Sequence, residues 1–171
     1  MVEHRVIERM LVLLDHEHAK IIKDGKVDGP FIDVAIDFFA TYVNRFHHGK
    51  EEKILFREQK EKPLSTEHKQ IMDDLKEHVF TQNAVEKLRN AQERLGTEKG
   101  ALDDVTKSIE TLLKWYPTHI EKEDKRFFFP AMEYLSLQEQ DAMLEEFWEF
   151  DGIFVHEMYM GKMRELEGKE K

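Results

Sequence analysis

Two stretches of the sequence repeat the same pairing of histidine with glutamate. One reads HHGKE from His47 to Glu51, and the other reads HIEKE from His119 to Glu123. Two residues four positions apart share one face of a helix, so each pair can hold one metal ion through its imidazole and reach a second through its carboxylate. A single copy would be weak evidence, because mixed-charge runs are common on solvated helix faces. Two copies predict a metal site built from nitrogen and oxygen ligands.

The first copy offers two histidines, and apolar periodicity distinguishes them. The helical stripe through His47 is apolar, whereas the stripe through His48 carries polar residues. The first stripe contains Ile36, Ala40, Val43 and Ile54, and the second contains Val34, Thr41, Arg45 and Leu55. We therefore predict that His47 and Glu51 face the interior, and that His48 lies at the surface together with His16 and His78.

The elements that must position these residues are long helices. Apolar residues recur every three or four positions, Gly and Pro are few, and no segment has the alternation of a strand. The turns are marked by residues 24–30, by Pro63 and by Gly96 with Gly100. The sequence predicts helices over 3–23, about 31–60, about 65–95 and about 102–129, and a fifth that starts at a Ser136–Glu139 capping box and is interrupted near Gly152.

These helices predict an all-α fold: an up-down-up-down four-helix bundle with an additional C-terminal helix. We expect one domain over residues 1–171, with the bundle over 1–133 and the appended helix over 136–167. Aromatic residues are expected in the core, among them Phe129 and Trp148.

The depth of each histidine along its helix selects further ligands. At ~1.5 Å per residue, His4 and the His47–Glu51 pair lie about 30–36 Å from the turn near Val27, whereas His18 is roughly 20 Å off that level. His68 begins the third helix close to the same end, and His119 with Glu123 reach broadly the same end. His156 follows the interruption at Gly152, which could fold it back towards the site.

Composition excludes several other classes of protein. The 171 residues carry a net charge of −10, which argues against nucleic acid as a partner. Without cysteine there can be no disulfide, zinc–thiolate site or iron–sulfur cluster. We find neither an apolar run of membrane-spanning length nor a signal peptide, and we expect a cytoplasmic protein.

The order H…HxxxE…H…HxxxE resembles the hemerythrin-like, or HHE cation-binding, family. The resemblance rests on EHRVIERML, FHHGKEEKILF, TEHKQIMDDL and HIEKEDKRFFFPAMEYL, four regions across about three quarters of the chain. It implies a four-helix bundle around a non-heme di-iron centre, oxo- or hydroxo-bridged, with Glu51 and Glu123 as bridging carboxylates. The ligand set that it implies is His4, His47, Glu51, His68, His119 and Glu123.

One position departs from the family's O2 carriers. Their third helix supplies two histidines four residues apart, and here Met72 follows His68 at that spacing. By residue type His156 is the best replacement, and Tyr159 could also reach such a site.

The family resemblance implies binding of O2 or a related small molecule, such as NO or peroxide, for sensing, storage or detoxification. A di-iron enzyme acting on peroxide or NO, with Tyr159 or Glu157 as its acid–base group, is one alternative. An iron store or scavenger and a metal-free helical interaction module are the others. Manganese or zinc could occupy the same ligands, because affinity order alone does not select iron.

Overall fold

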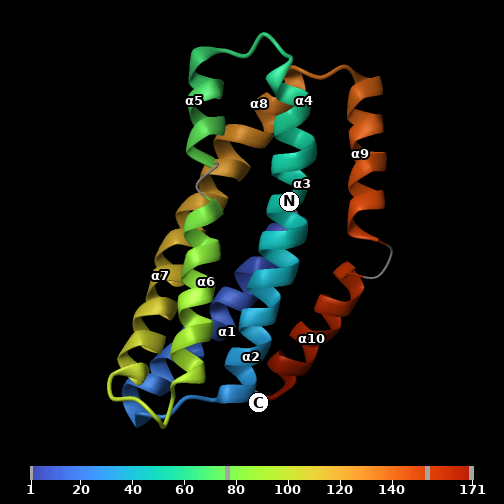
Figure 1. Ribbon diagram of the computed structural model, residues 1–171. Coiled ribbons are helices and arrows are strands. Elements are labelled where there is room, and N and C mark those ends of the chain that lie inside the picture. Colours follow the sequence, from blue (N-terminus) through green and yellow to red (C-terminus); the bar gives the residue numbers. More distant parts are fainter. Residues whose placement is uncertain (1, 76–77, 153–154, 170–171) are drawn as a thin grey trace.

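The computed structural model describes residues 2–75, 78–152 and 155–169, and helices account for nearly all of them. The segments are α1 (Val2–Asp24), α2 (Gly29–Asp37), η1 (Phe38–His47), α3 (His48–Lys50), η2 (Glu51–Leu55), α4 (Phe56–Lys60), α5 (Thr66–Leu75), α6 (His78–Glu93), α7 (Ala101–Lys122), η3 (Glu123–Phe127), α8 (Phe128–Glu133), α9 (Leu137–Asp151) and α10 (Val155–Lys169). No strand occurs among the described residues, which confirms the all-α prediction. Figure 1 shows α1, the stretch from α2 to α4, α6 and α7 side by side, with α9 and α10 along one flank.

The helix that carries the first repeat changes type along its length. It starts at Asp28, whose side chain accepts a hydrogen bond from the Phe31 amide (3.1 Å), and it continues without a gap to Lys60. Its segments η1 and η2 are π-helical, on either side of α3. Because i→i+5 bonding adds a residue to each turn, the buried stripe shifts along the chain. Consecutive His47 and His48 are consequently both buried, so the surface position predicted for His48 is wrong.

The third expected helix is described as two segments. α5 covers the upper part and α6 the lower part, and residues 76–77 between them lie outside the described residues. Gly96 and Gly100 have φ values of 77° and 95°, which glycine adopts without strain, and they make the turn into α7. The second repeat begins in α7 and ends in the π-helical segment η3. Each repeat thus has its glutamate at the start of a π-helical segment.

The apolar core is divided into two clusters with the repeats between them. The larger cluster includes Phe39, Val43 and Tyr116, which precede the repeats on their helices. The smaller one includes Ile54 and Phe127, which follow them. A layer of buried histidine and glutamate side chains therefore lies between two apolar clusters.

The C-terminal helices pack on the bundle. Ser136 and Glu139 form the expected capping box. The Ser136 hydroxyl accepts a hydrogen bond from the Glu139 backbone amide (3.3 Å), and the Glu139 carboxylate accepts one from the Ser136 backbone amide (2.8 Å). α9 ends at Asp151, next to the expected interruption at Gly152. The boundary between a bundle over 1–133 and an appended segment over 136–167 stays a prediction. Trp148 and Phe129 are 75% and 80% exposed, so their expected core positions are wrong.

No helix among the described residues is both long enough and apolar enough to span a membrane.

Ser136→Ala should fray the start of α9, because an N-cap replaced by alanine costs about 0.5–2 kcal/mol. Amide hydrogen exchange in residues 137–141 should accelerate while exchange in α1 stays unchanged. Gln138→Ala is the matched control, because Gln138 lies in the same turn and is not part of the capping box. Equal exchange in the two variants would contradict a stabilising capping box.

Candidate metal centre

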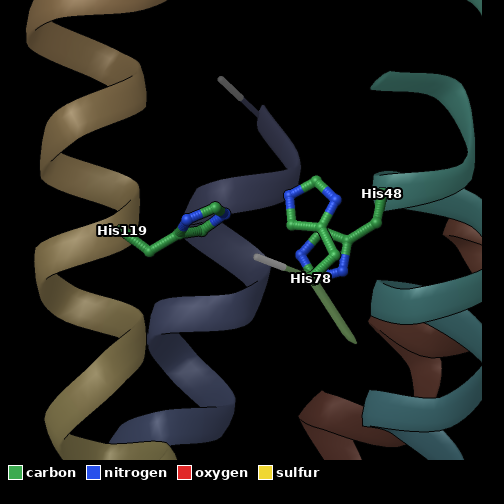
Figure 2. A group of neighbouring side chains, drawn as sticks. All are labelled: His48, His78 and His119. Atoms are coloured by element: carbon green, nitrogen blue, oxygen red, sulfur yellow. The ribbon is translucent and has the colours of Figure 1, made fainter. Parts of the chain in front are cut away.

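Seven buried side chains from α1, the η1–η2 stretch, α6 and the α7–η3 stretch form two adjacent groups. The four-residue group is His4, His47, Glu51 and Glu123, and the three-histidine group is His48, His78 and His119. Within each group, one nitrogen or oxygen atom of every residue lies within 4.8 Å of the others. Figure 2 shows His48 and His78 with overlapping rings and His119 reaching towards them from the opposite helix.

Each glutamate faces both groups, with a different oxygen towards each. Glu51 directs Oε1 at Nε2 of His47 and Oε2 at Nε2 of His78, both at 3.5 Å. Glu123 directs Oε2 at Nε2 of His4 (3.1 Å) and Oε1 at Nε2 of His119 (3.2 Å). A carboxylate with one oxygen on each side of a pair of sites is placed to bridge two metal ions.

Most of the inner atoms of these side chains are buried and make no hydrogen bond with the described part of the chain. None of the seven residues is more than 6% exposed. The unpartnered atoms are Nε2 of His4, His78 and His119, both nitrogens of His48, and both carboxylate oxygens of Glu51 and Glu123. Buried polar atoms in proteins are normally hydrogen-bonded, so such a concentration of unpartnered lone pairs is typical of a site that holds a cation. Imidazole and carboxylate donors suit iron, zinc or manganese, and the residues therefore fit a metal pair.

Three of the imidazoles are held from behind by a carboxylate. A carboxylate only accepts, so each Nδ1 carries the proton and each Nε2 lone pair points inward. The pairs, with their Nδ1–oxygen distances, are His4–Asp124 (2.8 Å), His47–Glu3 (2.9 Å) and His78–Glu52 (2.8 Å). Although burial opposes ionisation of Glu3, its contacts with His47 and with the Lys50 ammonium group lower its pKa to about 2.

The other two imidazoles are fixed by stacking. The His48 ring lies parallel to that of His78, with centroids 3.8 Å apart. The His119 ring stacks on Trp115 at 4.1 Å. Ring orientation at the site is thus set by carboxylates at three positions and by ring packing at two.

Burial controls the protonation of the site. It lowers the pKa values of His47, His48 and His119, which keeps these imidazoles neutral and able to bind a metal ion. Burial, together with the charge of Glu123, raises the pKa of Glu51 well above its ordinary value. Burial opposes ionisation of Glu123 too, but its contacts with His119 and His4 lower its pKa overall. In the metal-free site, Glu123 is therefore ionised readily, whereas ionisation of Glu51 is opposed.

A protein-family model, that of the hemerythrin HHE cation binding domain, matches residues 1–128. The chain belongs to this hemerythrin family. A search of curated proteins and a search of solved structures returned no significant match. The matched range contains all seven residues of the two groups and ends before α9.

Five of the seven ligands expected for a hemerythrin centre come together, and two lie elsewhere. His4, His47, Glu51, His119 and Glu123 are all members of the two groups. His68 makes a hydrogen bond through Nε2 to Gln59 (3.0 Å) and stacks on Phe127. His156 makes one through Nδ1 to Tyr42 (2.8 Å). Tyr159, the alternative, donates to Asp37 (3.1 Å).

Sequence reasoning missed His48 and His78, which take inner positions that it did not assign. Both were expected at the surface, and both are buried. His78 could have been found by counting from the turn at Pro63, because its depth below that turn matches that of His47. His48 had no such signal, since an ideal α-helix would turn it away from His47.

Replacing Glu51 by glutamine should stabilise the metal-free hemerythrin domain. The unfolded chain ionises Glu51 near its ordinary pKa of 4.5, whereas the folded site resists its charge, so stability falls as pH rises above 4.5. Glu51→Gln removes this effect and should raise the free energy of unfolding at pH 7 by at least about 1–3 kcal/mol, since this is the cost of an unsatisfied buried polar group and a charged group costs more. Urea unfolding in excess chelator measures the gain, which should vanish below pH 4.5.

The matched control for this variant is Glu121→Gln, an exposed glutamate in the second repeat. Its stability should stay within about 0.5 kcal/mol of the wild type. A Glu51→Gln variant less stable than the wild type at pH 7 would contradict the assigned charge balance.

Proposed function

We propose that this hemerythrin-family chain holds a pair of iron ions and binds O2 or a related small molecule, such as NO or peroxide, at that pair. The observation that carries the proposal is the placement of Glu51 and Glu123. Each directs one oxygen at a histidine of the four-residue group and the other at a histidine of the three-histidine group. The family model supports cation binding, and the choice of iron follows from the resemblance to hemerythrins.

Each half of the pair would have its own set of side chains. His4 and His47 would hold one ion, and His48, His78 and His119 would hold the other, with the two glutamates shared. The first half has fewer protein donors, so we assign the open position for a small molecule to it. Bound iron would supply a redox-active centre there.

The chain's own residues prepare the site for binding. The outer carboxylates keep three Nε2 lone pairs directed inward before any ion arrives. The apolar clusters on both sides limit access of water. The groups suggested for acid–base chemistry lie away from the inner atoms: Tyr159 is bonded to Asp37, and Glu157 is exposed. This favours reversible binding over turnover of peroxide or NO.

A pair of variants tests which histidines hold the ions. Wild-type protein reconstituted with Fe²⁺ without oxygen should contain about two iron per chain, the number expected for a site with two bridging carboxylates. His78→Ala should lose at least one of them, because Nε2 of His78 faces Glu51. His68→Ala is the matched control and should keep both, since its ring is bonded to Gln59. Elemental analysis after gel filtration gives the counts.

Two results would contradict the assignment. Equal iron loss in both variants would return His68 to the ligand set and contradict the choice of His78 over His68. A wild type without bound iron after reconstitution would contradict the di-iron proposal and leave a helical interaction module.

Optical spectroscopy tests the small-molecule ligand. Adding O2 to the reduced, iron-loaded protein should produce a visible charge-transfer band that disappears when O2 is removed, because binding is reversible. Assays for peroxide breakdown and NO reduction provide the comparison. Sustained turnover of either compound would favour the enzyme alternative, and release of iron during purification would favour a store.

A further inference from the structure

Helix α9, which lies beyond the residues matched by the family model, packs on the first repeat. The ring of Phe150 lies against Gly49, where an added Cβ would come within 3.0 Å of Phe150 Cζ. Lys53 Nζ lies 5.3 Å from the centre of the same ring. Gly49 sits between His48 and Glu51 in the sequence, so the Phe150 ring of α9 contacts the backbone that carries inner site residues.

A chain of polar contacts extends from the end of α9 to an imidazole of the site. Lys50 is only 5% exposed, and its Nζ donates to Asp151 Oδ2 (2.5 Å) and to Glu3 Oε1. The other oxygen of Glu3 accepts from Nδ1 of His47 at 2.9 Å. Asp151 therefore reaches His47 through one buried cation and one carboxylate.

The second repeat lacks both features. Glu121 occupies the position of Gly49 and is exposed. Lys122 occupies the position of Lys50, and its side chain is 30% exposed, with Asp74 at 3.9 Å. The glycine and the buried lysine of the first repeat are thus the residues that α9 covers, which indicates that this copy is fitted to the C-terminal segment.

We propose that docking of α9 and metal binding at the four-residue group are thermodynamically linked through the Asp151–Lys50–Glu3–His47 contacts. The inference rests on the proposed metal pair. Without the charge of Asp151, the buried Lys50 keeps one carboxylate partner in place of two and draws more strongly on Glu3, which accepts from Nδ1 of His47 and orients its ring. Asp151 is a positioning residue, since it touches neither ligand nor metal.

Linkage works in both directions. If a docked α9 favours metal binding, bound metal must favour docking of α9 by the same factor. The segment of the chain outside the family match would then report whether the site is loaded, by staying on the bundle or by leaving it.

Asp151→Asn and Glu149→Gln test the linkage in the full chain. Glu149 is an exposed acid on the same helix and provides the matched control. In titrations with Co²⁺ followed by visible absorption, Asp151→Asn should weaken one of the two sites by about fivefold to tenfold, within the usual range for coupled sites. Glu149→Gln should leave both affinities and both spectra unchanged.

Hydrogen exchange tests the reverse direction. Co²⁺ should slow exchange in residues 137–151 of the wild type by about fivefold, and this protection should be lost in Asp151→Asn. Circular dichroism of the metal-free variants checks their folding. Gly49→Ala is a second variant that keeps every charge and favours the helix, yet pushes Phe150 away, so it too should weaken one site.

The outcomes separate the two proposals. A wild type that binds two Co²⁺, with variants that bind them equally well, would overturn the linkage and leave the metal pair intact. Hydrogen-exchange rates in residues 137–151 that do not change when Co²⁺ binds would also overturn the linkage. A wild type that binds no Co²⁺ would contradict the metal pair itself and with it the linkage.

Discussion

Two carboxylates buried among imidazoles are the constraint on which the rest of the structure depends. Glu51 and Glu123 lie where water cannot solvate them, and their inner oxygens have no hydrogen-bond donor among the described residues. A charge buried without a partner is costly, and apolar packing elsewhere must offset that cost. The apolar clusters on either side of the site supply this packing, so the bundle tolerates a polar layer that no single helix could keep buried. A metal pair would convert the same layer from a cost into a source of stability.

The outer side chains show how the chain keeps such a layer ordered. Glu3, Glu52 and Asp124 each accept from a histidine Nδ1, and all three retain some exposure to solvent. These three outer carboxylates are therefore placed where water can still reach them, whereas Glu51 and Glu123 are enclosed together with the inner faces of the imidazoles. Lys50 is a buried cation, and it lies where the C-terminal segment covers the bundle. The first repeat thus depends on α9 in a way that the second does not.

Much of this arrangement can be read from the sequence, and the failures have physical causes. Apolar periodicity and turn residues located the helices, and the repeated spacing located His47, Glu51, His119 and Glu123. The choice between His47 and His48 assumed ideal α-helical geometry. The π-helical segments η1 and η2 displace the buried stripe, and both rings consequently face the interior. Nothing in the local residue types marks a π-helix, so neither the segments nor the burial of His48 could be predicted.

The choice of His68 instead of His78 on the third helix has a different origin, because the spacing along the chain held the information that favours His78. Measured from the helix ends at Lys60 and Thr66, on either side of the Pro63 turn, His47 lies roughly 20 Å down its helix at ~1.5 Å per residue, His78 about 18 Å and His68 only about 3 Å. Depth measured from the nearer turn therefore favours His78. His68 is selected only when all residues near that end of the bundle are treated as lying at the same depth. The contacts of α9, by contrast, could not be predicted from spacing, because they depend on how a separate segment docks on the bundle. The only local indication of a close contact was the glycine in HHGKE, where the second repeat has Glu121.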